Sequence, residues 1–235
     1  MPFVYDEART LSMYFDMRSK QSTMHKNDSA RLVLGYTRTM MGFLLFNPRP
    51  SRIGMIGLGG GSLAKYCLKH LPDAHFTAVE INPKVIALRK EFAIPPDHEK
   101  FQVIHADGAD YVSSGSEKLD VILVDGFDAD GHPAELCSTD FYDHCYARLD
   151  DGGVMVVNLL PSDQSMGTYV SRIHESFEGN VVVVNAEQDD NKIAFAHKGK
   201  DYSALSETIV QRVQTLAPDH PVQLQSTAQK ILCEM

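Results

Sequence analysis

The chain has 235 residues, 43% of them hydrophobic, and a formal net charge of −9. This length and composition are enough for a full hydrophobic core, and they exclude a fibrous or disordered chain. The acidic balance disfavours a nucleic-acid partner and mildly favours cationic ligands such as polyamines. From Met1 to Asp16 there is no continuous apolar run, so we expect no signal peptide, no membrane contact and a cytoplasmic location.

The cysteines do not form a recognisable framework. Cys67, Cys137, Cys145 and Cys233 lie far apart, without a C-x-x-C pair or a matching histidine spacing. This pattern argues against a zinc site and against disulfide bonds, so we expect reduced thiols and no metal.

The first 50 residues form a segment that ends at an Asn-Pro-Arg-Pro break. Arg9 to Lys26 are predicted to form a short hairpin. Asp28 or Ser29 is predicted to cap a helix that follows. One face of that helix carries apolar and aromatic side chains, namely Leu32, Tyr36, Met40, Leu44 and Leu45. This apolar face offers a surface for the association of subunits.

From Arg52 onward, short apolar runs alternate with helical patterns, which is typical of a parallel sheet wrapped by helices. The predicted strands lie near 52–57, 76–80, 101–105, 119–125, 153–159, 180–186 and 192–197, with helices at 61–70, 83–91, 139–148, 166–178 and 202–216. Only Asn185 to Lys192 join the last two strands, too few residues for a crossover helix, so these strands must pair antiparallel.

The predicted fold is therefore α/β. It is the Rossmann-like fold of S-adenosylmethionine-dependent methyltransferases, with a seven-stranded, mostly parallel sheet that ends in an antiparallel hairpin. We divide the chain into a short hairpin and helix segment, residues 1–50, and a Rossmann-like cofactor-binding catalytic domain, residues 51–235.

The strongest local signal is a buried strand that runs into a glycine turn and then a helix. Gly57, Gly59 and Gly61 allow the backbone to approach a ligand closely, and the helix presents free amide groups there. Glu80 ends the next strand, 23 residues past Gly57, where its carboxylate can accept hydrogen bonds from both hydroxyls of a ribose. Together these features favour a nucleoside site over a strand-end glutamate that is merely solvated.

The next two strands also end in carboxylates. Asp107 is predicted to accept a hydrogen bond from the exocyclic amine of adenine, and Gly108 to let the flat base lie close. Asp125 ends the following strand, and the loop after it carries Asp128. Beside a sulfonium cofactor, these two carboxylates can hold and deprotonate an amine nucleophile. The alternative is an acidic loop that faces solvent and caps a helix.

These residues resemble the spermidine synthase, or polyamine aminopropyltransferase, family over most of 52–160. Gly57–Ser62 is similar to the family's Gly-Gly-Gly-Asp-Gly-Gly turn, and Val79–Asn82 to its Val-Glu-Ile-Asp motif. Ala106–Ala109 is similar to its Gly-Asp-Gly motif, and Asp125–Asp128 to its Asp-Ser-Ser-Asp-Pro loop.

The resemblance implies a reaction and a set of roles. An amine such as putrescine attacks the aminopropyl group of decarboxylated S-adenosylmethionine, and methylthioadenosine leaves without the help of a metal. The implied roles are Asp125 as general base, Asp128 and Tyr36 as holders of the amine, Glu80 as ribose ligand, Asp107 as adenine ligand and Gln21 as a cofactor-side glutamine. Since members of the family commonly associate, a homodimer is expected.

Three features depart from the family. Gly60 stands where the family's turn carries an aspartate that holds the aminopropyl ammonium, so ordinary S-adenosylmethionine becomes a conceivable donor. The region before the glycine turn is too short for the family's usual multi-stranded sheet, so part of the substrate wall must come from elsewhere, such as another subunit. The connection Ala186 to Asn191 lacks the family's Pro-Tyr-Pro-type segment.

Other functions remain open at this stage. Methyl transfer uses the same fold and cofactor, although methyltransferases usually carry an acidic residue where this chain has Met55. A catalytically silent nucleoside-binding module is a further alternative, which the presence of Asp125 and Asp128 argues against. A nicotinamide oxidoreductase fits poorly, because the terminal hairpin and the turn at Asp107 indicate a pocket for an adenosyl thioether.

Overall fold

A seven-stranded sheet forms the centre of the computed structural model, which describes residues 2–15, 20–127, 131–199 and 205–235. Its strand order is β6-β5-β4-β7-β8-β10-β9. The strands are β4 (Arg52–Ile56), β5 (His75–Glu80), β6 (Phe101–His105), β7 (Leu119–Val124), β8 (Leu149–Leu159), β9 (Val181–Asn185) and β10 (Lys192–His197). Strands β4 to β8 run parallel, whereas β10 pairs antiparallel with both β8 and β9. The predicted fold class and its terminal hairpin are confirmed.

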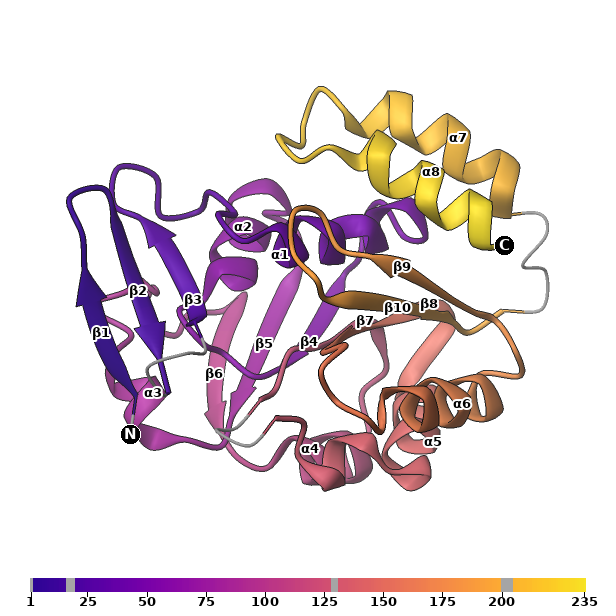
Figure 1. Ribbon diagram of the computed structural model, residues 1–235, viewed down its shortest axis with the longest axis horizontal. Helices are drawn as coiled ribbons and strands as arrows, with labels where there is room; N and C mark the ends of the chain where they lie inside the picture. The colour runs from indigo at the N-terminus through magenta and orange to yellow at the C-terminus, as the bar shows by residue number, and fades with distance from the viewer. Residues whose placement is uncertain (1, 16–19, 128–130, 200–204) are drawn as a thin grey trace.

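Helices cover both faces of this sheet (Figure 1). The helices are α1 (Gly35–Met40), α2 (Ser62–His70), α3 (Pro83–Ala87), α4 (Gly108–Ser114), α5 (Thr139–Arg148), α6 (Met166–Ser176), α7 (Leu205–Leu216) and α8 (Leu224–Glu234), with short 3-10 helices η1 (Met41–Leu45) and η2 (Ala134–Cys137). One layer contains α1, α2, α7 and α8, and the opposite layer contains α4, α5 and α6. No helix in the described ranges combines the length and the apolar character that crossing a membrane requires.

Two hydrophobic cores flank the sheet, because successive strand residues point to opposite faces. In β7, Val121 and Leu123 face the layer of α2, whereas Ile122 and Val124 face the layer of α5. This period-two burial produces the apolar runs that predict the strands from sequence.

The segment before Pro50 forms a separate three-stranded antiparallel sheet of β1 (Phe3–Asp6), β2 (Thr10–Tyr14) and β3 (Lys20–His25). The predicted hairpin corresponds to β2 and β3, and β1 is an additional strand. The sequence predicts that this region is too short for the family's usual multi-stranded sheet. It nevertheless forms a sheet of three strands, in which β1 needs only four residues to pair with β2. Met13 of β2 packs in the same hydrophobic core as Phe76 of β5, so this small sheet contacts the central one. The division of the chain into two parts at residue 50 stays a prediction.

The helix of this segment begins later than its sequence indicates. Asp28 pairs with His25 in an isolated bridge, and α1 starts only at Gly35. Leu44 and Leu45 in η1 are fully buried, because α7 and α8 pack over this 3-10 helix. The proposed association surface on the apolar face is therefore wrong: the chain's own C-terminal helices cover it.

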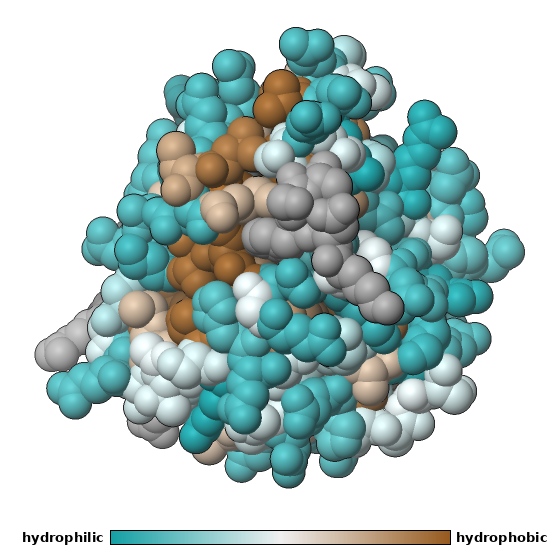
Figure 2. Space-filling view, turned by 90° about the vertical axis from the view of Figure 1, so that its right-hand side faces the viewer, coloured by the Kyte–Doolittle hydropathy of each residue, from teal (hydrophilic) through white to brown (hydrophobic). Residues whose placement is uncertain are grey.

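The C-terminal hairpin of α7 and α8 completes the layer above β9 and β10 (Figure 1). Helix α8 is not predicted from the sequence, whose last predicted helix is 202–216. The side of the molecule on which α6 and the C-terminus lie shows a band of apolar surface among hydrophilic residues (Figure 2). All four cysteines are free thiols, and Cys233 is the exposed one.

Candidate active site

The predicted site residues lie in a row along one edge of the sheet. Five neighbouring strands, in the order β6, β5, β4, β7 and β8, run parallel, so their carboxyl ends meet at the same edge. Within two residues of these ends lie, in the same order, Asp107, Glu80, Gly57, Asp125 and Asn158. Ligands of open α/β sheets bind in the crevice at this edge.

The glycine turn takes backbone conformations that other residues rarely adopt. Gly57, Gly59 and Gly61 have φ angles of 91°, 49° and 66°. A Cβ on Gly57 would also lie 2.4 Å from the carbonyl oxygen of Asp125, so the backbone of β7 packs directly on the turn. The nearest atom to a Cβ on Gly59 would be Ser22 Cβ at 3.7 Å, which leaves this part of the turn open. The turn is therefore shaped for close approach of a ligand.

Glu80 connects β5 to this turn. Its Oε2 accepts a hydrogen bond from the amide of Leu58 at 2.9 Å, and its Oε1 accepts one from the amide of Asn82 at 2.9 Å. The side chain is buried. Because each carboxylate oxygen has two lone pairs, both oxygens keep acceptor capacity for ribose hydroxyls. The predicted ribose ligand thus also fixes the conformation of the glycine turn, a role that the sequence pattern does not indicate.

Asp107 is the N-cap of α4. Its Oδ1 accepts hydrogen bonds from the amides of Ala109, at 2.7 Å, and Asp110, at 3.3 Å. The adenine contact of Asp107 stays a prediction. Gly108 is buried, and a Cβ there would lie 2.3 Å from Ile56 Cγ2, so close packing of α4 on β4 requires glycine at this position.

Asp125 accepts two side-chain hydrogen bonds. Asn158 Nδ2 donates to Oδ1 at 2.8 Å, and the Tyr36 hydroxyl donates to Oδ2 at 3.2 Å. Burial raises the pKa of Asp125 to about 7, and the hydrogen bonds from Asn158 and Tyr36 oppose that shift. Burial and the nearby Asp125 carboxylate raise the pKa of Tyr36, so its hydroxyl stays a donor at neutral pH. A carboxyl with a pKa near neutrality is suited to general-base chemistry.

A raised pKa at Asp125 makes the wild-type protein less stable as the pH rises. The native state binds this proton more tightly than the unfolded chain between about pH 4 and about pH 7, so native stability falls across that range. We expect Asp125→Asn, which cannot titrate, to gain stability relative to wild type over this window, by at most about 4 kcal/mol. Urea unfolding of both proteins at several pH values measures the difference, and parallel pH curves would contradict the shifted pKa.

The N-terminal sheet lies beside Asp125. Gln21, on β3, lies beside Tyr36, since its carbonyl oxygen is 3.4 Å from the Tyr36 hydroxyl. The Tyr36 hydroxyl therefore lies between the Gln21 backbone and the Asp125 carboxylate. The roles of Gln21 on the cofactor side and of Tyr36 beside the amine stay predictions. Asp128, the predicted amine-holding residue, lies outside the described residues.

Sequence reasoning misses two neighbours of this site, Asn158 and Ser22. Asn158 is a buried polar residue near the end of β8, beside Asp125, and this position is the signal that identifies it. Ser22 follows Gln21 on β3. A Cβ on Gly60 would lie 2.6 Å from Ser22 Oγ and 2.7 Å from Phe92 Cδ1. Ser22 and Phe92 thus occupy the space that a side chain at position 60 would need.

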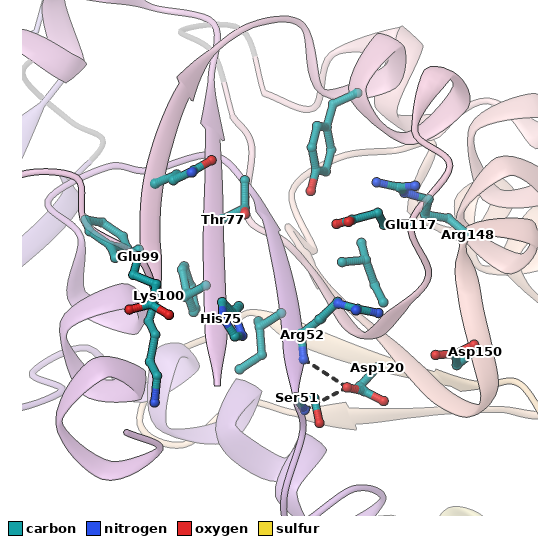
Figure 3. Close-up of a pocket in the computed structure, with 16 residues that line it drawn as sticks. Ser51, Arg52, His75, Thr77, Glu99, Lys100, Glu117, Asp120, Arg148 and Asp150 are labelled. Atoms are coloured by element: carbon teal, nitrogen blue, oxygen red, sulfur yellow. Dashed lines mark hydrogen bonds between the residues drawn. The ribbon is translucent and has the colours of Figure 1, made fainter. Parts of the chain in front are cut away.

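A cavity of about 580 Å³ lies at the other edge of the sheet, where β4, β5 and β6 begin (Figure 3). Charged side chains of both signs line it, among them Arg52, Lys100, Asp120 and Arg148. Asp120 accepts hydrogen bonds from the amides of Ser51, at 2.7 Å, and Arg52, at 2.9 Å. None of the predicted site residues lines this cavity. In the described ranges, no group of three or more His, Cys, Asp or Glu side chains is placed to hold a metal ion.

The sheet order, the terminal hairpin and the glycine turn define a protein of the Rossmann-like methyltransferase fold class. Residues 33–184 match the spermine/spermidine synthase domain. A polyamine aminopropyltransferase of Chromobacterium violaceum is 37% identical over 91% of this chain and 82% of its own length. The chain belongs to the spermine/spermidine synthase family.

Solved structures agree on the fold. A spermidine synthase in complex with the transition-state analogue AdoDATO has a TM-score of 0.72 and 19% identity, over 97% of this chain and 84% of the other. Human methyltransferase-like protein 13 in complex with SAH has a TM-score of 0.71 and 22% identity, over 84% of this chain and 93% of the other. At these identities the similarity concerns the fold alone.

Proposed function

We propose that the chain transfers an aminopropyl group from decarboxylated S-adenosylmethionine to an amine such as putrescine and releases methylthioadenosine. The observation that carries this proposal is the hydrogen-bonded carboxyl of Asp125, whose pKa is raised to about 7, beside the glycine turn of a spermine/spermidine synthase family member. The names of the similar proteins support the same reaction.

In this proposal the edge of the sheet holds the nucleoside. The turn of Gly57, Gly59 and Gly61 approaches the donor, and Glu80 accepts hydrogen bonds from the ribose. Asp107 and Gly108 receive the adenine, and Gln21 lies on the donor side. The free acceptor capacity of the Glu80 carboxylate supports its role.

The amine binds on the side of Asp125, where Tyr36 and Asp128 hold it. Its nitrogen lone pair forms a bond to the aminopropyl carbon that is bonded to sulfur. The carbon–sulfur bond at that same carbon breaks, and the bonding electrons leave with sulfur as methylthioadenosine. Asp125 takes the proton that the nitrogen loses. Since a sulfonium is already a good leaving group, the protein mainly aligns the two partners and keeps the amine neutral.

Mass spectrometry of the products tests this function. We expect methylthioadenosine, and a diamine product that is heavier by one aminopropyl group, when the protein is incubated with decarboxylated S-adenosylmethionine and a panel of diamines. Ordinary S-adenosylmethionine in a parallel incubation serves as the comparison. Formation of S-adenosylhomocysteine and a methylated amine in that incubation, without aminopropyl transfer in the first, would contradict the proposal.

Methyl transfer from ordinary S-adenosylmethionine is the second candidate, and one observation favours it. Position 60 is a glycine, with Ser22 and Phe92 packed beside it, so it presents no carboxylate to attract an ammonium or repel a carboxylated donor. The same incubations distinguish the two reactions by their products.

We also propose that the protein acts in the cytoplasm as a homodimer whose first 50 residues form a distinct segment. The apolar band on the side of α6 and the C-terminus supports self-association (Figure 2). Exposed apolar side chains on and beyond the C-terminal helices include Val210 and Met235.

A further inference from the structure

The connection between β9 and β10, residues 186–191, is docked onto the start of α1. Asp189 Oδ2 accepts a hydrogen bond from the amide of Tyr36 at 2.7 Å, and the amide of Glu187 donates to Thr39 Oγ1 at 2.9 Å. The Glu187 carboxylate pairs with Arg38 at 3.1 Å. A Cβ on Gly35 would lie only 1.3 Å from the carbonyl oxygen of Glu187, so this approach requires glycine.

The other end of this connection reaches Asn158. Asn191 Nδ2 donates to Asn158 Oδ1 at 2.8 Å, and Asn158 Nδ2 in turn donates to Asp125 Oδ1 at 2.8 Å. An ionised carboxylate can only accept, so the NH₂ group of Asn158 must face Asp125 and its carbonyl must face Asn191. The hydrogen bond from Asn191 to the side-chain carbonyl of Asn158 supports this orientation of the amide.

We propose that the 186–191 connection is a brace that positions Asp125 through both of its hydrogen-bond donors. Asn191 orients Asn158, and Asp189 holds the backbone of Tyr36. These three residues, Asn158, Asn191 and Asp189, are positioning residues that act through Asp125. The inference rests on the proposed role of Asp125 as the base.

The groups around Asp125 determine how its pKa changes when the brace is lost. Among the titratable groups that contact Asp125 or its two donors are Tyr36 from α1, Asp189, which bonds to the amide of Tyr36, and His132 from the loop after β7, which contacts Asn158. His132 Nε2 lies 3.0 Å from the backbone carbonyl oxygen of Asn158, and His132 Nδ1 lies 3.3 Å from Asp163 Oδ2. The hydrogen bond from Asn158 lowers the pKa of Asp125 against the effect of burial, so loss of this donor raises that pKa.

Two variants, Asn158→Ala and Asn191→Ala, test the brace without changing the charge of the protein. We expect kcat to fall about 10²-fold for the first and about tenfold for the second, because a small misplacement of a reacting group is costly. Affinity for methylthioadenosine should stay the same. The double variant should be no slower than Asn158→Ala alone, because Asn191 acts through Asn158. Additive losses would overturn the chain of contacts.

Adjacent aspartates provide a matched control. Asp189 holds the amide of Tyr36, whereas Asp190 is exposed on the same connection. Asp189→Ala and Asp190→Ala remove the same charge, and only the first should lower kcat. Equal rates for these two variants would overturn the role of Asp189.

Carbon-13 NMR titration of the aspartate carboxyls, in protein without substrate, separates this inference from the proposed function. We expect the pKa of Asp125 to rise in Asn158→Ala and, by less, in Asn191→Ala. If wild type forms no aminopropyl product, the proposed function fails while the titration still tests the brace. An unchanged titration of Asp125 in both variants would overturn the inference. Should Asn158→Ala fail to fold, Asn191→Ala, which alters a partly exposed connection, carries the test.

Discussion

Asp125→Asn is expected to lower the rate of aminopropyl transfer by roughly 10²–10⁴-fold, the usual contribution of a general base. The asparagine is nearly the same size and can still accept the hydrogen bond from Asn158, but it cannot take a proton from the amine. Steady-state kinetics with decarboxylated S-adenosylmethionine and a diamine measure the loss. Wild-type activity in the variant would refute the role of Asp125.

Nucleoside binding should not change in the same variant. Asp125 approaches the glycine turn through its backbone carbonyl, which lies 2.4 Å from where a Cβ of Gly57 would be, and the substitution leaves that carbonyl in place. Calorimetry with methylthioadenosine should therefore give equal dissociation constants for the variant and wild type. Asp143→Asn, which removes an exposed carboxylate from α5, is a control for the loss of charge and should be as active as wild type.

The pH profile separates loss of the base from a general loss of activity. With a pKa of about 7, Asp125 becomes protonated as the pH falls through neutrality, so wild-type kcat/KM should decline on the acidic side with that midpoint. The residual activity of Asp125→Asn should lack this acidic limb. If the limb persists in the variant, another group is the base.

Sequence alone predicts the central sheet well, because its signals are local. The alternating burial of residues such as Val121 and Ile122 produces apolar runs, and the short connection between β9 and β10 forces them to pair antiparallel. The glycines of the turn are needed for their own backbone angles, so they too can be recognised from the sequence.

The N-terminal segment is harder to predict because its structure depends on distant residues. Gly35 begins α1 where the carbonyl of Glu187 packs against it, and the amide of Tyr36 bonds to Asp189, 153 residues away. No pattern within residues 28–40 contains this information. The burial of Leu45 by α7 and α8 likewise cannot be predicted without knowing where these C-terminal helices pack.

In the candidate site, too, some residues can be predicted from local sequence and others depend on distant contacts. Carboxylates at strand ends, such as Glu80 and Asp125, are predictable because parallel strands bring them to one edge. Asn158 and Asn191 are not, since an asparagine near a strand end is common and their mutual contact spans 33 residues. The geometry of a site therefore reveals positioning residues that its chemistry does not indicate.

The second large effect is expected for Glu80→Gln, which should weaken nucleoside binding by roughly 1.5–3 kcal/mol, the range for a hydrogen bond to a charged group. This corresponds to a dissociation constant for methylthioadenosine that is about 10- to 150-fold higher. Glutamine keeps only one oxygen, so its NH₂ group must face either the amide of Leu58 or that of Asn82, both of which donate to Glu80 at 2.9 Å in wild type. The ribose loses an acceptor and the glycine turn loses an anchor.

Asp120→Asn is the matched control, because Asp120 also accepts hydrogen bonds from two backbone amides, those of Ser51 and Arg52, but at the opposite edge of the sheet. Both substitutions remove one charge from a carboxylate that accepts two backbone amides. In Asp120→Asn the remaining oxygen can keep both contacts, because both amides donate to Oδ2, whereas Glu80→Gln loses one of its two. We therefore expect Asp120→Asn to be at least as stable as Glu80→Gln in thermal unfolding. Only Glu80→Gln should change the affinity for methylthioadenosine in calorimetry. Unchanged affinity in Glu80→Gln would remove Glu80 from the nucleoside site. An equal loss in Asp120→Asn would show that the effect comes from the stability of the sheet and not from contact with the ribose.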